Sequence, residues 1–236
     1  MAELQGKNDL KGLFYVFIAL ILSLVADVGM SARSNAVTTI MGIVSLAALI
    51  LILVGLSKVK EVSPHFRKSR NMYIAQLIMT IAIIAALVVA VAGAYSSNTA
   101  GVFGGLVVFF VFLILLLVFA ILATVNLLQG CANVAMDNKD RVFARKCHTA
   151  WRLYVAAVVL TIIAVIIIAV ILLNNLSLLQ NMSDNQMGDF VGKIGVGAIV
   201  LIIAMILTLI AYILKTVRVY QTYKKFGAAA AAPVNG

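Results

Sequence analysis

The basic residues of this chain are distributed very unevenly around six long apolar stretches. The stretches run approximately over Leu13–Gly29, Val37–Leu56, Met72–Ala94, Val102–Leu128, Ala150–Leu173 and Gly195–Leu214. A helix needs roughly 20 apolar residues to cross a hydrocarbon core about 30 Å thick, and these stretches are about that long. They are apolar all round, whereas strands of a membrane barrel alternate over about ten residues. The sequence therefore predicts an all-α integral membrane protein with six transmembrane helices.

The composition supports lipid as the solvent for much of this surface. Of the 236 residues, 64% are hydrophobic and only 11% are charged. A soluble domain carries about 25% charged residues and about 45–50% apolar ones. A chain of this size has no core large enough to hide so much apolar surface from water.

The distribution of Lys and Arg predicts the orientation of the helices. Only Arg33 and Lys193 fall in the first, third and fifth connections. The other sixteen lie before the first stretch, after the last, in the second and fourth connections or, for Arg152, at the very start of the fifth stretch: Lys7, Lys11, Lys58, Lys60, Arg67, Lys68, Arg70, Lys139, Arg141, Arg145, Lys146, Arg152, Lys215, Arg218, Lys224 and Lys225. Short loops rich in Lys and Arg stay in the cytoplasm. We therefore expect a multi-pass cell-membrane protein made of three hairpins, with both termini cytoplasmic.

This topology also accounts for the formal net charge of +10. Bases on the inner side are attracted to the anionic lipids of the inner leaflet. We therefore expect membrane lipids as partners, together with a second copy of the chain or another membrane subunit, and no nucleic acid.

The three hairpins, at about 13–56, 72–128 and 150–214, are expected to form one domain over residues 1–226. An Ala-rich tail over 227–236 is expected to be disordered. Each hairpin is followed by an aromatic residue and a basic doublet: Phe66-Arg67-Lys68, Phe143-Ala144-Arg145-Lys146 and Tyr223-Lys224-Lys225. The nearly even spacing of the doublets favours a tandem repeat of two-helix units. The alternative is that the charge rule and interfacial aromatic residues alone produce the likeness.

These doublets are the main candidate site. We expect an inner ring that contacts anionic lipid headgroups or an acidic partner, made of Arg67, Lys68, Arg145, Lys146, Lys224 and Lys225. Each such base is worth about 1 kcal/mol near an anionic surface. The alternative is that they set the topology and do nothing more.

Two further polar pairs are candidates inside or beside the spans. Gln76 and Asn126 fall at similar depth on neighbouring antiparallel helices, so their amides are expected to hydrogen-bond as structural glue. Asp27 and Arg33 are expected to form an ion pair at an outer turn, which contributes little if exposed.

Small residues indicate where helices approach closely. Ala82, Ala86, Ala90 and Ala94 form a ladder on the third span, and Gly197, Ala204 and Ala211 form a stripe on the sixth. Such stripes favour close packing in lipid. On the fourth span, bulky phenylalanines favour a helix that faces lipid or another subunit of an oligomer. Its polar series Gln129, Asn133 and Asp137 predicts that this helix continues beyond the bilayer.

No motif of catalysis or cofactor binding occurs in the sequence. The spacing of Cys131, Cys147, His65 and His148 matches no usual metal pattern, so we expect no catalytic residue, cofactor or metal. The sequence favours a non-catalytic scaffold, accessory or self-assembling subunit. The alternative is a transporter or channel for a small or lipid-like solute, although the spans contain no proline and their two charged residues, Asp27 and Arg152, lie near span ends.

Overall fold

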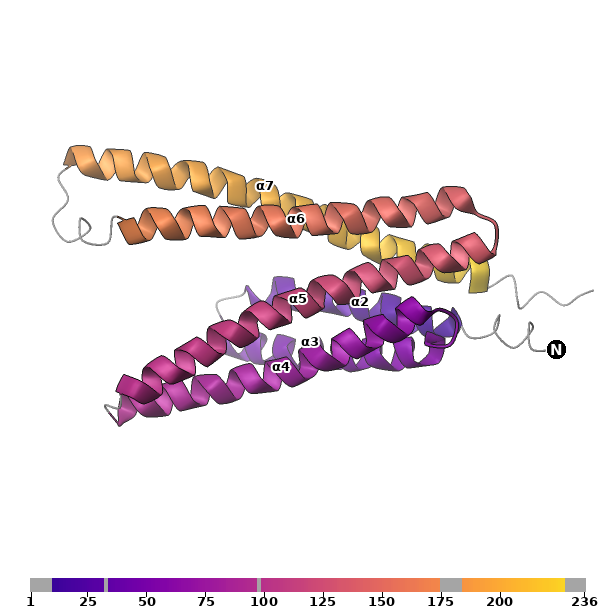
Figure 1. Ribbon diagram of the computed structural model, residues 1–236, viewed down its shortest axis with the longest axis horizontal. Coiled ribbons are helices and arrows are strands. Elements are labelled where there is room, and N and C mark those ends of the chain that lie inside the picture. Colours follow the sequence, from indigo (N-terminus) through magenta and orange to yellow (C-terminus); the bar gives the residue numbers. More distant parts are fainter. Residues whose placement is uncertain (1–9, 32–33, 97–98, 175–183, 228–236) are drawn as a thin grey trace, which may run out of the picture. The chain divides into compact units, whose positions relative to one another are not determined.

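All regular structure is helical in the computed structural model, which describes residues 10–31, 34–96, 99–174 and 184–227 (Figure 1). The helices are α2 (Lys11–Met30), α3 (Asn35–Val59), α4 (Pro64–Tyr95), α5 (Thr99–Asp137), α6 (Arg141–Asn174) and α7 (Asp184–Thr222), followed by a π-helical turn, η2 (Tyr223–Gly227). Within these ranges, six helices are long and apolar enough to cross a membrane, as predicted.

Local capping explains where α4 begins. Ser63 has extended backbone, and its hydroxyl accepts a hydrogen bond from the His65 backbone N–H at 3.3 Å. Pro64 occupies the first helical position, where its missing N–H costs nothing. These signals start the helix eight residues before the predicted apolar stretch at Met72.

The turn between α5 and α6 is equally well defined. Lys139 adopts the left-handed conformation, with φ of 58°. Asp140 then caps α6, because its carboxylate accepts a hydrogen bond from the Phe143 backbone N–H at 3.0 Å.

Four of the helices are longer than a bilayer core requires. α5 and α7 each have 39 residues, α6 has 34 and α4 has 32. At 1.5 Å per residue, the longest extend about 58 Å, against a hydrocarbon core of about 30 Å. Helices of this length tilt or continue into the headgroup region and beyond.

The chain divides into two compact units, residues 1–147 with 216–236 and residues 148–215. In the first unit, α2 packs on α3 and α4 packs on α5 (Figure 1). The α2–α3 pair is antiparallel, because Gly12 lies against Gly55 and Gly29 lies against Met41. The expectation of one domain over residues 1–226 stays a prediction.

The buried core of the first unit gathers where α2, α4 and α6 begin and where α3 and α5 end. The fully buried side chains there are Leu13, Val16, Leu20, Leu56, Val59, Phe66, Leu127, Leu128, Cys131 and Cys147. Farther along α4 and α5, large apolar side chains are exposed, such as Ile81, Val88 and Ile114. An exposed apolar surface of this extent suits lipid.

Small residues line the helix contacts in both units. In the first unit, Ala86 and Ala90 are buried, and a Cβ on Gly105 would lie 2.7 Å from that of Ala90. The predicted ladder is therefore buried only in part, since Ala94 is exposed.

In the second unit, the predicted stripe of Gly197, Ala204 and Ala211 is buried throughout. Gly197 lies against Ile168, so α7 approaches α6 closely there.

Candidate functional site

The six predicted bases all lie at one end of the first unit, which we call the basic end. Arg67 and Lys68 are in the first turn of α4, Arg145 and Lys146 are near the start of α6, and Lys224 and Lys225 are in η2. All six side chains are exposed.

Contacts between the elements bring these segments together. The Ser69 hydroxyl donates to the Ala123 carbonyl at 2.9 Å, which fixes the start of α4 on α5. Lys225 forms an ion pair with Asp140, which fixes η2 on the start of α6. A Cβ on Gly227 would lie 3.3 Å from that of Leu10, so η2 also reaches the start of α2.

The aromatic residue before each basic doublet acts as an anchor. Phe66 is fully buried and its ring lies against Gly130 of α5. Phe143 is 7% exposed and meets Phe226 edge-on, with ring centroids 5.8 Å apart. Tyr223 lies 5.3 Å from Phe14 of α2. The recurring pattern therefore combines an aromatic ring, buried in Phe66 and Phe143 and half-buried in Tyr223, with exposed bases shortly after it in the sequence.

A pocket of about 470 Å³ opens within the basic end. Its lining residues come from the start of α6, the end of α7 and η2: Phe143, Lys146, Arg218, Gln221, Lys224 and Lys225. The sequence predicted three of these bases and noted Phe143 as the aromatic residue before a doublet, but it did not place Arg218 or Gln221 in the site. The signal for Arg218 was present, because it lies near the end of α7, six residues before Lys224.

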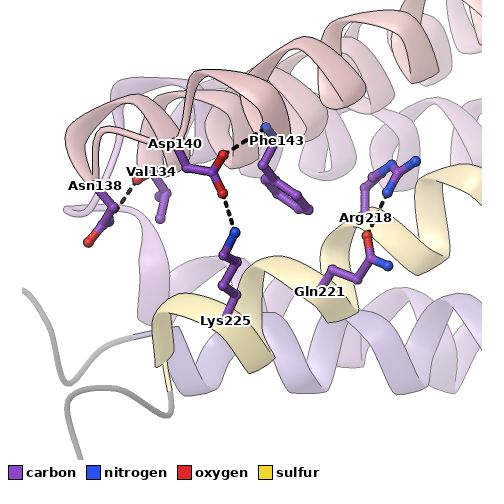
Figure 2. Close-up of polar contacts among 7 residues, drawn as sticks. All are labelled: Val134, Asn138, Asp140, Phe143, Arg218, Gln221 and Lys225. Carbon is purple, nitrogen blue, oxygen red and sulfur yellow. Dashed lines mark hydrogen bonds and ion pairs between the residues drawn. The ribbon is translucent and has the colours of Figure 1, made fainter.

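The Arg218 guanidinium is held on two sides (Figure 2). Its terminal N–H donates to the Gln221 side-chain oxygen at 2.6 Å. Its carbon lies 6.0 Å from the centroid of the Phe143 ring, at the limit of a cation–π contact. The Arg218 Nε is buried and has no hydrogen-bond partner among the described residues.

Among the described residues, Asp140 is the one carboxylate hydrogen-bonded to residues that line the pocket (Figure 2). It accepts from the Lys225 ammonium and from the Phe143 backbone N–H. The hydrogen bond from Lys225, followed by that from Phe143, lowers the pKa of Asp140 below its ordinary value. The carboxylate is therefore charged at neutral pH and offsets part of the local positive charge.

Arg67, like Lys225, is paired with an acidic residue. Its guanidinium donates to the Glu61 carboxylate at 2.6 Å, and both side chains are more than half exposed. An exposed pair of this kind contributes little to stability.

The structure pairs Asn126 with His65 instead of with Gln76. The Asn126 side-chain oxygen lies 3.3 Å from the His65 Nδ1, and its amide nitrogen donates to the Leu122 carbonyl at 2.8 Å. The Gln76 amide nitrogen is buried and without a hydrogen-bond partner. The expected bond between the two amides is therefore not formed, because His65 at the start of α4 reaches Asn126.

The other expected pair, Asp27 with Arg33, lies only partly within the described residues. Asp27 lies in the last turn of α2 with an exposed side chain. Arg33 lies outside the described residues.

The cysteines and histidines are not among the residues that line the pocket. Cys131 and Cys147 are free thiols, and both are buried. His148 accepts a hydrogen bond from the Trp151 indole at 3.0 Å, if its Nδ1 is unprotonated. In the described parts of the chain, no three His, Cys, Asp or Glu side chains gather as metal ligands would.

Comparison with known protein families, curated protein sequences and solved structures finds no match to this chain. Bases that converge on a pocket beside one neutralised carboxylate attract an anion and hold it.

Proposed function

We propose that the protein is a non-catalytic, multi-pass membrane protein that acts as a scaffold, accessory or self-assembling subunit. Its basic end would contact anionic lipid headgroups. The observation that supports this most is the gathering of exposed bases at one end of the first unit, where Phe66, Phe143 and Tyr223 anchor them. The rest of that unit exposes mainly apolar side chains, as lipid contact requires.

The proposal includes a topology of three hairpins with both termini in the cytoplasm. The basic end would then face the anionic inner leaflet, where each base contributes about 1 kcal/mol. The antiparallel pairing of α2 with α3 agrees with the first hairpin. In the second unit, Lys215 lies 5.8 Å from the Tyr154 ring while Gly197 lies against Ile168, so α6 and α7 are also antiparallel. The shared aromatic-plus-doublet pattern favours a repeated two-helix unit.

The test compares the wild type with a variant in which all six bases are changed to glutamine. The variant carries Arg67→Gln, Lys68→Gln, Arg145→Gln, Lys146→Gln, Lys224→Gln and Lys225→Gln. Each purified protein is placed in nanodiscs of phosphatidylcholine and phosphatidylglycerol, and native mass spectrometry counts the retained lipids. Because both leaflets have the same composition, a change of orientation does not affect the result.

We expect the lipids retained by the wild type to contain a larger fraction of phosphatidylglycerol than the nanodisc does. The lipids retained by the six-base variant should contain the same fraction as the nanodisc. A control with Arg67→Lys and Arg145→Lys keeps the charges and should behave like the wild type. If the six-base variant kept the full excess, the lipid-contact function would be wrong. The oligomeric mass in the same spectra reports self-assembly.

A further inference from the structure

We propose that the pocket lined by Lys146, Arg218, Gln221, Lys224 and Lys225 is a specific site for a membrane lipid whose headgroup carries a phosphomonoester. This inference rests on the proposed function, because it requires the basic end to lie among lipid headgroups. It goes further by distinguishing one pocket, and one headgroup chemistry, from general attraction to anionic lipid.

The charge of the pocket indicates more than one negative charge on its ligand. Asp140 holds Lys225 in an ion pair, so one of the four bases is already neutralised. Lys146, Arg218 and Lys224 form no salt bridge among the described residues, although the charge of Lys146 also acts on Asp140. A phosphodiester supplies a single negative charge, whereas a phosphomonoester carries about −1.5 to −2 at pH 7. The monoester is therefore the better complement.

The geometry of Arg218 suits a phosphate in particular. Gln221 and Phe143 hold the guanidinium in place, which reduces the entropy lost when a ligand binds. The buried Nε of Arg218 lacks an acceptor, and phosphate oxygens accept from two guanidinium N–H groups at once. The amide nitrogen of Gln221 is left to donate as well, since its oxygen accepts from Arg218.

The depth of the pocket along the helices matches the lipid phosphates. Lys146 lies one turn before the apolar stretch that begins at Ala150, and Arg218 lies one turn after the stretch that ends at Leu214. Four residues at 1.5 Å each place both about 6 Å outside the hydrocarbon edge. The headgroup layer occupies roughly 5–8 Å on each side of the core.

The size of the pocket leaves room for a whole headgroup. Its volume of about 470 Å³ falls within the range of about 300–1,000 Å³ for small-molecule sites. A bare phosphate would fill only part of it. The lipid is therefore expected to insert its phosphate between Arg218 and the lysines, with its acyl chains beside the helices.

The test uses the full-length protein in nanodiscs that contain phosphatidic acid and phosphatidylglycerol in equal amounts. Phosphatidic acid supplies the monoester and phosphatidylglycerol supplies a diester. The pocket variant carries Lys146→Gln and Arg218→Gln, and the matched control carries Arg67→Gln and Lys68→Gln. Both remove two charges from the basic end, but only the first touches the pocket. Native mass spectrometry measures the ratio of the two lipids retained.

We expect the wild type and the matched control to retain more phosphatidic acid than phosphatidylglycerol. In the pocket variant, the ratio of phosphatidic acid to phosphatidylglycerol should be about tenfold lower. Tenfold corresponds to the loss of about one charge-assisted hydrogen bond. The Arg218→Lys variant keeps the charge without the planar fork, so its preference should fall between the two. This milder change also keeps the test decisive if the double variant fails to fold.

The outcomes separate the two proposals. Equal retention of both anionic lipids by the wild type would overturn the proposed specificity of the pocket for a phosphomonoester. The proposed general contact with anionic lipid would remain. Retention of neither would overturn both. Competition by soluble glycerol 3-phosphate at the concentration of the lipid would identify a soluble phosphate ester as the ligand and overturn the lipid assignment.

Discussion

At the scale of single residues, Asp140 has two roles that can be separated by substitution. It caps α6 through the Phe143 N–H and pairs with Lys225 of η2. Its pKa is lowered in the folded protein, so its contribution to stability is complete above the unfolded pKa and is lost as the pH falls through the folded pKa. We expect the unfolding temperature in detergent micelles to fall as the pH is lowered through the acidic range below about 3.9.

Asp140→Asn should flatten this pH dependence, because asparagine caps a helix without a charge. Asp140→Ala removes the cap as well and should unfold at a lower temperature than the asparagine variant at pH 7. Circular dichroism at each pH gives the unfolding temperatures. An asparagine variant with the same acid sensitivity as the wild type would contradict this account of Asp140.

The polar pair inside the first unit illustrates what the sequence can predict at this scale. The depths of Gln76 and Asn126 follow from helical rise, and both were expected at similar depth on neighbouring spans. The partner of Asn126 does not follow from depth, because His65 at the start of α4 reaches the same amide. Which side chain contacts the Asn126 amide depends on the rotation of each helix about its axis. The sequence does not determine this rotation, because the apolar stretches have no strong amphipathic character.

At the scale of helices, the contact between α2 and α3 depends on two facing glycines. A Cβ on Gly55 would lie 2.5 Å from the Gly12 carbonyl oxygen, and a Cβ on Gly12 would lie 2.2 Å from that of Gly55. We expect Gly55→Ala to push the helices apart and to destabilise the protein by about 1–3 kcal/mol, as overpacking does.

Gly42 provides a matched control on the same helix, because a Cβ there meets nothing within 4 Å. Gly42→Ala should be neutral or stabilising by up to about 1 kcal/mol, since alanine favours the helix. Thermal unfolding in micelles measures both. Equal stability of the two variants would show that the glycine contact does not hold α2 on α3.

The ends of the helices were less predictable than their existence. Hydropathy marks only the segment that lipid can cover, so the predicted fourth span stopped at Leu128 whereas α5 continues to Asp137. The polar series along this end correctly indicated a longer helix. It did not indicate that the same turns hold Cys131 and Val134 in the buried core, because alternating polar and apolar faces also suit an exposed extension.

At the scale of the whole molecule, apolar residues identify the spans but do not separate core from lipid-facing surface. Leu127 is fully buried, whereas Ile114 on the same helix is 62% exposed, and both are aliphatic residues in one continuous stretch. In water, burial and hydrophobicity coincide, but in lipid either environment accepts these side chains. The position of the pocket could not be predicted either. The pocket forms only where the end of α7 lies beside the start of α6, and apolar patterning does not say which helix ends are neighbours.

The proposed topology makes a prediction about the two ends of α4. Ser96 at its last turn should face the outside, and Lys68 at its first turn should face the cytoplasm; both side chains are exposed. In intact cells, a membrane-impermeant maleimide should label Ser96→Cys nearly completely and leave Lys68→Cys at background until the cells are permeabilised. The wild-type Cys131 and Cys147 are buried, so background labelling should be low.

The control uses Ser57→Cys at the end of α3 as a matched inner position. Lys68→Cys removes one of the sixteen orienting bases, whereas Ser57 is exposed and its substitution retains every base. If Ser57→Cys and Lys68→Cys were labelled from outside and Ser96→Cys were protected, the orientation would be the reverse of the one proposed. The basic end would then lie at the outer leaflet, where the attraction to anionic inner-leaflet lipid does not apply.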